Sequence, residues 1–109
     1  MALRELHFSF EPYDHYTAFE PAWSHSGVVG SGDMEVLMEH RPQNGKVTAK
    51  VVTPVTGFDL VWEKVLYKFV NESKIGDLHL EINDNNATPF IVSMRLKQAL
   101  MEAKEDTQT

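Results

Sequence analysis

The sequence switches between two hydrophobic repeats, and this switching limits the chain to folds that combine strands with helices. Apolar and polar residues alternate over 34–39, 46–53 and 78–83, the period-two pattern of a strand with one face in the core. Over 57–72 the apolar residues recur instead at intervals of three and four, which predicts an amphipathic helix. The chain is therefore expected to be an α+β protein.

Two threonines mark the expected starts of helices. Thr56 precedes Asp59 by three residues, which is the spacing of a capping box, and so indicates the start of the first helix. Thr88, followed by Pro89, supplies an N-cap and a first-turn proline for a second helix. The predicted apolar face of this second helix consists of Val92, Leu96, Ala99 and Leu100.

The two ends of the chain are less regular than its middle. Residues 1–25 are expected to start as an edge strand, in which Leu6, Phe8 and Phe10 alternate with polar residues, and to continue as a loose connector. Residues 102–109 are expected to form a flexible polar tail. All 109 residues are assigned to one domain, because a second core could not be built from what remains.

These elements predict a small single-sheet fold. Residues 41–45 contain a proline and an Asn-Gly pair, so the strands at 34–39 and 46–53 are expected to form a hairpin. The predicted order is β-β-β-α-β-α. It indicates one mainly antiparallel sheet with two helices packed on one face and water on the other.

The composition excludes several classes of function. A net charge of −6 without a basic cluster argues against nucleic-acid binding and favours protein partners with basic docking surfaces. The chain has no cysteine, so any thiol chemistry must come from a cofactor. It has no apolar run of the roughly 20 residues that a membrane span needs and no secretory pattern at its start, so a cytoplasmic location is expected.

Titratable residues are numerous but show no catalytic or metal-binding arrangement. The histidines lack metal-ligand spacing and are expected at the surface or in turns. Four carboxylates are expected on the exposed face of the sheet, where they would be solvated rather than catalytic. The histidines are His7, His15, His25, His40 and His79, and the carboxylates are Glu35, Glu39, Glu81 and Asp84.

The segment Gly30-Ser31-Gly32-Asp33 is the best candidate site. Flanking glycines leave the Ser31 hydroxyl open to another protein or a bulky group. Taken alone, the same residues also fit a plain turn before a strand, in which Ser31 and Asp33 bond the local backbone. A serine hydrolase is excluded because the G-x-S-x-G elbow and ordered triad partners are absent.

Several segments together resemble the acyl carrier (delta) subunit of malonate decarboxylase. They run from Gly27-Val28-Val29-Gly30-Ser31-Gly32-Asp33-Met34-Glu35-Val36-Leu37 through Val51-Val52-Thr53, Gly57-Phe58 and Val61-Trp62 to Glu81-Ile82-Asn83-Asp84, Ala87-Thr88-Pro89, Arg95-Leu96 and Gln98-Ala99-Leu100. The likeness covers about Gly27 to Leu100. It implies a non-catalytic carrier subunit of a multi-subunit decarboxylase complex, rather than the four-helix bundle of ordinary acyl carrier proteins.

The resemblance also implies a cofactor and a set of partners. In that family the serine of the G-S-G-D segment carries 2'-(5''-phosphoribosyl)-3'-dephospho-CoA through a phosphodiester bond, so Ser31 is the implied attachment site, with Gly30, Gly32 and Asp33 around it. Ser26 lacks the flanking glycines. The implied cargo is an acetyl or malonyl thioester, and the implied partners are an acyl-carrier transferase subunit, decarboxylase subunits and a prosthetic-group transferase.

Two other interpretations remain open from the sequence. The acyl carrier subunit of citrate lyase shares the prosthetic group and serves another substrate. A non-enzymatic interaction module would use Gly30-Ser31-Gly32 only as a turn and its acidic face as a docking surface, and in it Ser31 would stay unmodified.

Overall fold

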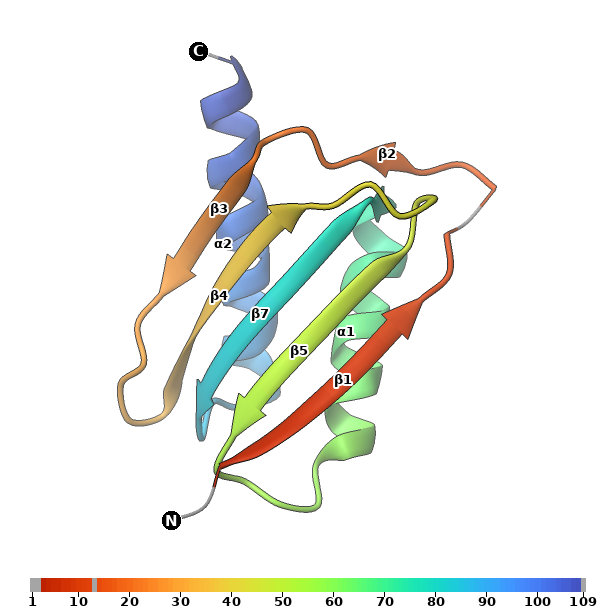
Figure 1. Cartoon of the computed structure of the whole chain (residues 1–109). Coiled ribbons are helices and arrows are strands. Elements are labelled where there is room, and N and C mark those ends of the chain that lie inside the picture. Colours follow the sequence, from red (N-terminus) through yellow and green to blue (C-terminus); the bar gives the residue numbers. More distant parts are fainter. Residues whose placement is uncertain (1–2, 13, 109) are drawn as a thin grey trace.

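A computed structural model describes residues 3–12 and 14–108 and contains a five-stranded sheet, a two-stranded pair and two helices (Figure 1). The helices are α1 (Asp59–Ser73) and α2 (Pro89–Gln108). The strands are β1 (Arg4–Phe10), β2 (Thr17–Ala18), β3 (Trp23–Gly27), β4 (Asp33–His40), β5 (Val47–Thr53), β6 (Ile75–Gly76) and β7 (Leu78–Asn85).

The five-stranded sheet has the order β1-β5-β7-β4-β3. Neighbouring strands are antiparallel except for β5 and β7, which run parallel. Parallel neighbours need a crossover connection, and α1 lies in the segment that provides it. The predicted mainly antiparallel sheet is confirmed, and β1 is the edge strand expected near the start of the chain.

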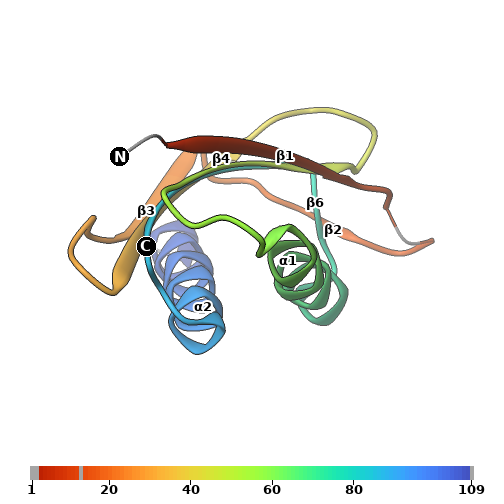
Figure 2. The ribbon, with the colours of Figure 1, turned by 90° about the horizontal axis from the view of Figure 1, so that it is seen from below.

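Both helices cover the same face of this sheet (Figure 2). The alternation predicted for the strands is observed: in β4 the side chains of Met34, Val36 and Met38 are fully buried, while their neighbours are only half-buried. Leu66 of α1 and Leu96 of α2 are fully buried from the helix side. The fold is thus α+β with two helices on one face, as predicted, and is not a four-helix bundle.

The predicted hairpin between 34–39 and 46–53 is wrong. β4 and β5 run in opposite directions, as hairpin strands do, but β7 lies between them and pairs with both. The six residues that separate His40 from Val47 can span two strand spacings, about 10 Å. Asn44 and Gly45 do form a turn, both with positive φ. The partner that β4 and β5 share, β7, lies more than thirty residues further along the chain.

Strand β3 lies where the sequence predicted a loose connector. Its one large apolar side chain does not face the core: Trp23 is exposed, whereas Ser24 and Ser26 are buried. The hydroxyl of Ser24 donates a hydrogen bond to the backbone oxygen of Ala99 in α2, at 2.7 Å. Small hydroxyl side chains let the helix approach this strand closely, and a pattern based on hydrophobicity cannot detect such an interface.

The helix ends confirm one capping prediction and correct the other. The backbone N–H of Ile91 donates to the Thr88 hydroxyl oxygen at 3.3 Å, as an N-cap does. In α1 the N-cap is Phe58, and no side chain caps this end, because Gly57 adopts a φ of 84° and separates Thr56 from the helix. The capping box at Thr56 is therefore wrong.

Helix α2 also continues beyond the end that the sequence predicted. It extends to Gln108, across most of the segment expected to be a polar tail, and Ala103 is buried in the core. An isolated alanine among charged residues gives no apolar stripe, so its contribution to the core was missed.

Candidate functional site

Ser31 is exposed in a tight turn that joins β3 to β4. The backbone N–H of Asp33 donates to the Gly30 carbonyl oxygen at 3.0 Å and closes the turn over residues 30–33. Gly32 has a φ of 76°, and a type II turn requires such a positive value at its third position. We call residues 30–33 the serine turn.

The space around the serine turn is open. A Cβ atom added at Gly32 would meet nothing within 4 Å, and one added at Gly30 would meet only the Cγ2 of Val28, at 3.9 Å. No side chain of the described residues bonds the Ser31 hydroxyl. The geometry therefore leaves this oxygen free for a bulky substituent, which is the accessibility that the sequence indicated.

The backbone of the serine turn is nevertheless fixed to the rest of the fold. On one side, the N–H of Gly32 donates to the carbonyl oxygen of Asn85, at the end of β7, at 2.8 Å. On the other side, Arg95 of α2 donates two hydrogen bonds to Asp33: Nε donates to Oδ1 at 3.0 Å and Nη2 to Oδ2 at 2.6 Å. The exposed hydroxyl thus stands on a turn that is anchored to both the sheet and a helix.

Asp33 is held in its charged form by these contacts. The hydrogen bonds from Arg95 lower the pKa of the Asp33 carboxyl, and the backbone N–H of Met34, which donates to Oδ1 at 2.7 Å, lowers it further. The same pair raises the pKa of the Arg95 guanidinium. Because both carboxylate oxygens are engaged within the chain, the role of Asp33 in the structure is to position the serine turn.

The anchor extends to the strand before the turn. Arg95 Nη1 donates to Gln98 Oε1 at 3.0 Å, and the hydroxyl of Ser26 donates to the same oxygen at 3.1 Å. Gly27, with a φ of 87°, has no room for a side chain, because a Cβ atom would collide with the Met34 carbonyl oxygen and press on the Arg95 side chain. We call Ser26, Gly27, Asp33, Arg95 and Gln98 the turn clamp.

Three members of the turn clamp received no role from the sequence. In the sequence, Arg95 and Gln98 stand out only as members of the segments that carry the family resemblance, and Ser26 only as a serine without flanking glycines. The spacing of Arg95 and Gln98, three residues apart on a helix, places them on one face. Nothing in the sequence indicates that this face lies against residues 26–33.

Exposed apolar side chains lie beside the serine turn and elsewhere at the same end of the molecule. Val28 and Val29 precede the turn and are 64% and 51% exposed. Val29 and Leu3 line a hollow of about 380 Å³ together with Asn85, whose carbonyl oxygen holds the turn. The segments that begin α1 and α2 reach the same end of the fold (Figure 1), and they bring the exposed rings of Phe58 and Phe90.

The carboxylates expected together on the exposed sheet face are only partly brought together. Glu35, Glu39 and Glu81 lie on the face without helices. Asp84 is buried on the opposite face, where Oδ2 accepts a 2.8 Å hydrogen bond from the Thr53 hydroxyl. Because side chains alternate along β7, Asp84 lies on the same face of the sheet as Leu80 and Ile82. The expected position of Asp84 on the exposed face was therefore wrong.

Among the described residues, no group of three or more His, Asp or Glu side chains could hold a metal ion. His25 instead lies 3.2 Å from Glu35, and His79 lies 3.6 Å from Glu81, as isolated pairs. The first of these contacts, with a hydrogen bond from Asn83, lowers the pKa of Glu35. Partial burial lowers the pKa of His79.

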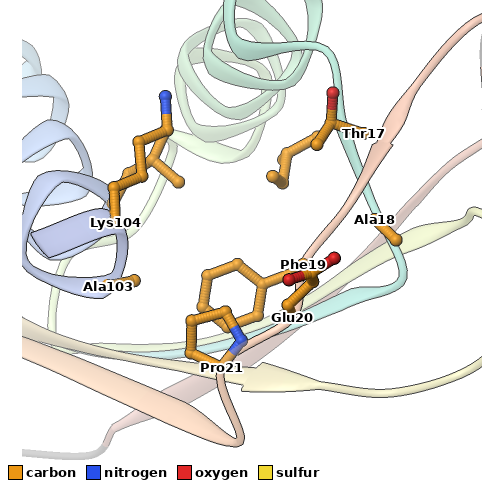
Figure 3. A pocket seen from close by; sticks show the side chains of 9 residues that line it. Thr17, Ala18, Phe19, Glu20, Pro21, Ala103 and Lys104 are labelled. Atoms are coloured by element: carbon orange, nitrogen blue, oxygen red, sulfur yellow. The ribbon is translucent and has the colours of Figure 1, made fainter. Parts of the chain in front are cut away.

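A second pocket lies at the opposite end of the molecule (Figure 3). It has a volume of about 280 Å³ and is lined mainly by apolar groups of β2, α2 and the segment after β2. Its polar side chains, Thr17, Glu20 and Lys104, stand at separate places on its wall (Figure 3). It brings together no nucleophile and base, and it is distant from Ser31.

In the part of the chain that the structure describes, neither helix has the length and apolar character required to cross a membrane.

Comparison with known proteins assigns the family. Residues 22–103 match the family model described as "Malonate decarboxylase delta subunit (MdcD)". The chain belongs to this family. The resemblance carried by the segments from Gly27 to Leu100 is thereby confirmed, and the match favours it over the citrate lyase alternative.

Individual relatives agree with this assignment. A protein of Malonomonas rubra named "Malonate decarboxylase acyl carrier protein" is 50% identical over 107 residues, which cover 98% of this chain and 95% of that protein. A protein of the same name from Xanthomonas campestris pv. campestris (strain B100) is 43% identical over 74 residues, 68% of this chain and 70% of the relative. Both relatives carry the name of this family's protein, and the first is similar to nearly the whole chain.

A solved structure of a related protein supports the fold. A chain in the "Crystal structure of a Pseudomonas malonate decarboxylase hetero-tetramer in complex with malonate" superimposes with a TM-score of 0.76 at 33% sequence identity. The match covers 92% of this chain and 98% of that one. The shared fold thus extends over almost the whole length of both proteins.

Proposed function

We propose that this chain is the acyl carrier subunit of a malonate decarboxylase and that it carries acetyl and malonyl groups as thioesters on 2'-(5''-phosphoribosyl)-3'-dephospho-CoA attached to Ser31. The observation that carries the proposal is the free Ser31 hydroxyl, displayed on an anchored turn in a chain of this family. Citrate as the substrate is disfavoured by the names of the relatives.

The residues around Ser31 fit a large covalent group. The hydroxyl oxygen would hold the group through a phosphodiester, and the positions flanking it offer open space rather than side chains. When bound, the group supplies the thiol on which an acyl group can be carried, and the chain has no cysteine of its own. The turn clamp would keep the attachment point in one place while the rest of the arm moves.

The chain itself is proposed to do no chemistry. Its task would be to present Ser31 in turn to an acyl-carrier transferase subunit, to decarboxylase subunits and to the prosthetic-group transferase. The exposed valines before the serine turn and the exposed rings that begin α1 and α2 suit this task, because an apolar surface beside the attachment point favours contact with partner proteins. A cytoplasmic location, where such a complex would work, belongs to the same proposal.

The test is the intact mass of the carrier isolated from its own host. We expect wild-type protein to carry additional mass equal to the phosphoribosyl-dephospho-CoA group, and Ser31→Ala to carry none and to abolish malonate decarboxylation by the complex. Because the Ser31 side chain makes no hydrogen bond among the described residues, this substitution should change the free energy of unfolding by less than about 0.5 kcal/mol.

Ser9→Ala is the matched control, since it removes an exposed hydroxyl of β1 that lies outside the turn clamp. This variant should still be modified. A bare wild-type protein in an active complex, or added mass on Ser31→Ala, would show that the proposal is wrong.

A further inference from the structure

The outer surface between the two helices contains a large groove. It has a volume of about 730 Å³ and is lined by residues of both α1 and α2. The helices lie side by side on one face of the sheet, and no other described element covers their outer sides (Figure 2). We call this feature the helix groove.

The helix groove collects positive charge on an acidic protein. Lys64 and Lys68 of α1 and Lys97 of α2 line it, and Glu72 is the carboxylate among its lining residues. None of the three lysines has a carboxylate partner among the described residues. Outside the groove, five basic side chains are neutralised by ion pairs within the chain, namely Arg4, Arg41, Lys46, Lys50 and Arg95. Lys74 and Lys104 also have no ion pair among the described residues, but they do not line the groove.

The groove also exposes apolar side chains at helical spacing. Phe90, Met94 and Met101 of α2 line it, and Phe90 and Met101 are 74% and 60% exposed. The side chains of Val65 and Phe69 in α1 form part of the opposite wall. A soluble protein leaves large apolar groups exposed in one place mainly where a partner covers them.

We propose that the helix groove is the docking site for an acidic amphipathic helix of a partner protein. The apolar side of such a helix would cover Phe90, Met94 and Met101, and its carboxylates would meet the three unpaired lysines. Two neighbouring helices present a cleft into which a third helix packs through side chains spaced three and four residues apart. The net charge of −6 opposes an acidic partner at long range, so the attraction would come from the lysines of the groove at short range.

Nucleic acid and anionic membrane fit the groove less well. Binding to a phosphate backbone or to a lipid surface draws on many cations, and three lysines beside one carboxylate provide few. The apolar side chains of the groove would also remain without partners on a phosphate backbone. An acidic amphipathic helix would contact both the lysines and the exposed apolar side chains of the groove.

The helix groove is connected to the serine turn. Gln98 lines the groove and, with the same side chain, holds Ser26 and Arg95 in the turn clamp. A helix docked in the groove would therefore contact the element that positions Ser31. This proposal rests on the proposed function, in that the docked partner is taken to be a subunit of the same decarboxylase complex.

The first test compares charge reversals inside and outside the groove. The carrier is mixed with the remaining decarboxylase subunits of its host, and the dissociation constant is measured by calorimetry at low and high salt. Lys64→Glu/Lys97→Glu should weaken binding at least tenfold and reduce its salt dependence. Lys50→Glu/Lys74→Glu makes the same change in net charge outside the groove and should bind within about twofold of wild type.

Equal binding by the two double variants, or equal weakening of both, would overturn the groove proposal. The mass at Ser31 is measured on the same samples. Bare Ser31 in the wild-type protein would contradict the proposed function, whereas a modified carrier whose binding is unaffected by the groove substitutions would contradict the groove proposal alone.

The second test identifies what occupies the groove. A photo-reactive benzoyl-phenylalanine placed at Phe90 should crosslink the complex through an acidic helical segment of another subunit. The same probe at Trp23, which is 65% exposed on edge strand β3, should not capture that segment. Crosslinks to a second copy of this chain or to nucleic acid, or none at all from Phe90, would overturn the proposal.

Discussion

At the scale of single residues, the site depends on one residue with a free side chain and on several whose side chains are fully engaged. Ser31 is accessible because its neighbours are glycines, and it is well positioned because Asp33 is bound by Arg95 through two hydrogen bonds. Gly27 makes the second condition possible, since only a residue without Cβ lets the Arg95 side chain lie against the strand end. The glycines beside Ser31 thus make its hydroxyl accessible, whereas Gly27, Asp33 and Arg95 hold the turn in place.

Gly27→Ala should destabilise the fold more than Gly57→Ala. Both glycines have positive φ values, 87° and 84°, so both substitutions carry the backbone cost of about 1 to 2 kcal/mol. A Cβ at Gly57 meets nothing within 4 Å, whereas one at Gly27 collides with the Met34 carbonyl oxygen. In urea unfolding we expect Gly27→Ala to lose about 3 kcal/mol or more. Equal losses in the two variants would show that the close packing at Gly27 contributes nothing.

At the scale of elements, the two helices differ in how they begin. Helix α2 has a side-chain cap at Thr88 and a proline in its first turn, and the sequence predicted both. Helix α1 begins at Asp59 without a side-chain cap, although the sequence around Thr56 has the spacing of a capping box. The spacing is a local property, but the backbone at Gly57 turns away from the helical path before the helix starts.

Thr88→Ala should therefore lower the free energy of unfolding by about 1 kcal/mol, because the first turn of α2 loses the hydroxyl that accepts from Ile91. Thr56→Ala is the matched control. Its side chain is exposed and has no hydrogen bond among the described residues, so it should change stability by less than about 0.5 kcal/mol. Chemical denaturation of both variants checks this. A larger loss for Thr56→Ala would mean that the capping box does form.

The strands and helices differ in whether the sequence predicts them. The alternating segments became β4, β5 and β7, and both helical repeats became helices, because side-chain periodicity is set by the local backbone. Strand β3 was missed because its buried residues, Ser24 and Ser26, are polar. Their burial is favourable only because the Ala99 carbonyl and the Gln98 side chain accept hydrogen bonds from their hydroxyl groups.

At the scale of the whole molecule, carboxylates link distant segments and make the fold sensitive to acid. Asp33 joins the serine turn to α2, and Asp77 accepts hydrogen bonds from the N–H groups of Gln43 and Gly45 in the loop between β4 and β5. The hydrogen bonds from Arg95 lower the pKa of Asp33, and those two backbone donors lower the pKa of Asp77. Each group therefore favours the folded state in its charged form.

Folding stability should consequently fall on acidification. A carboxyl whose folded-state pKa is depressed contributes stability that is complete above its unfolded pKa, about 3.9 for aspartate, and that is lost as the pH falls through the folded value. We expect the free energy of unfolding, measured in urea from pH 7 to pH 2, to decline below about pH 4. Asp33→Asn/Asp77→Asn should be less stable at pH 7 and should show a shallower decline. The same slope in wild type and variant would contradict these assignments.

The sequence by itself determined the kinds of the long elements, their order from 46 to 101 apart from the two-residue strand β6, the solvent-facing serine between two glycines and the family. These depend on local periodicity, on the space around a glycine and on residues close together in the chain. Only the tertiary structure decided that β7 separates β4 from β5, that two serines of β3 face a helix, and that Arg95 holds Asp33 from 62 residues away. Contacts of this kind have no periodic signature, because each is selected by the packing of the whole chain.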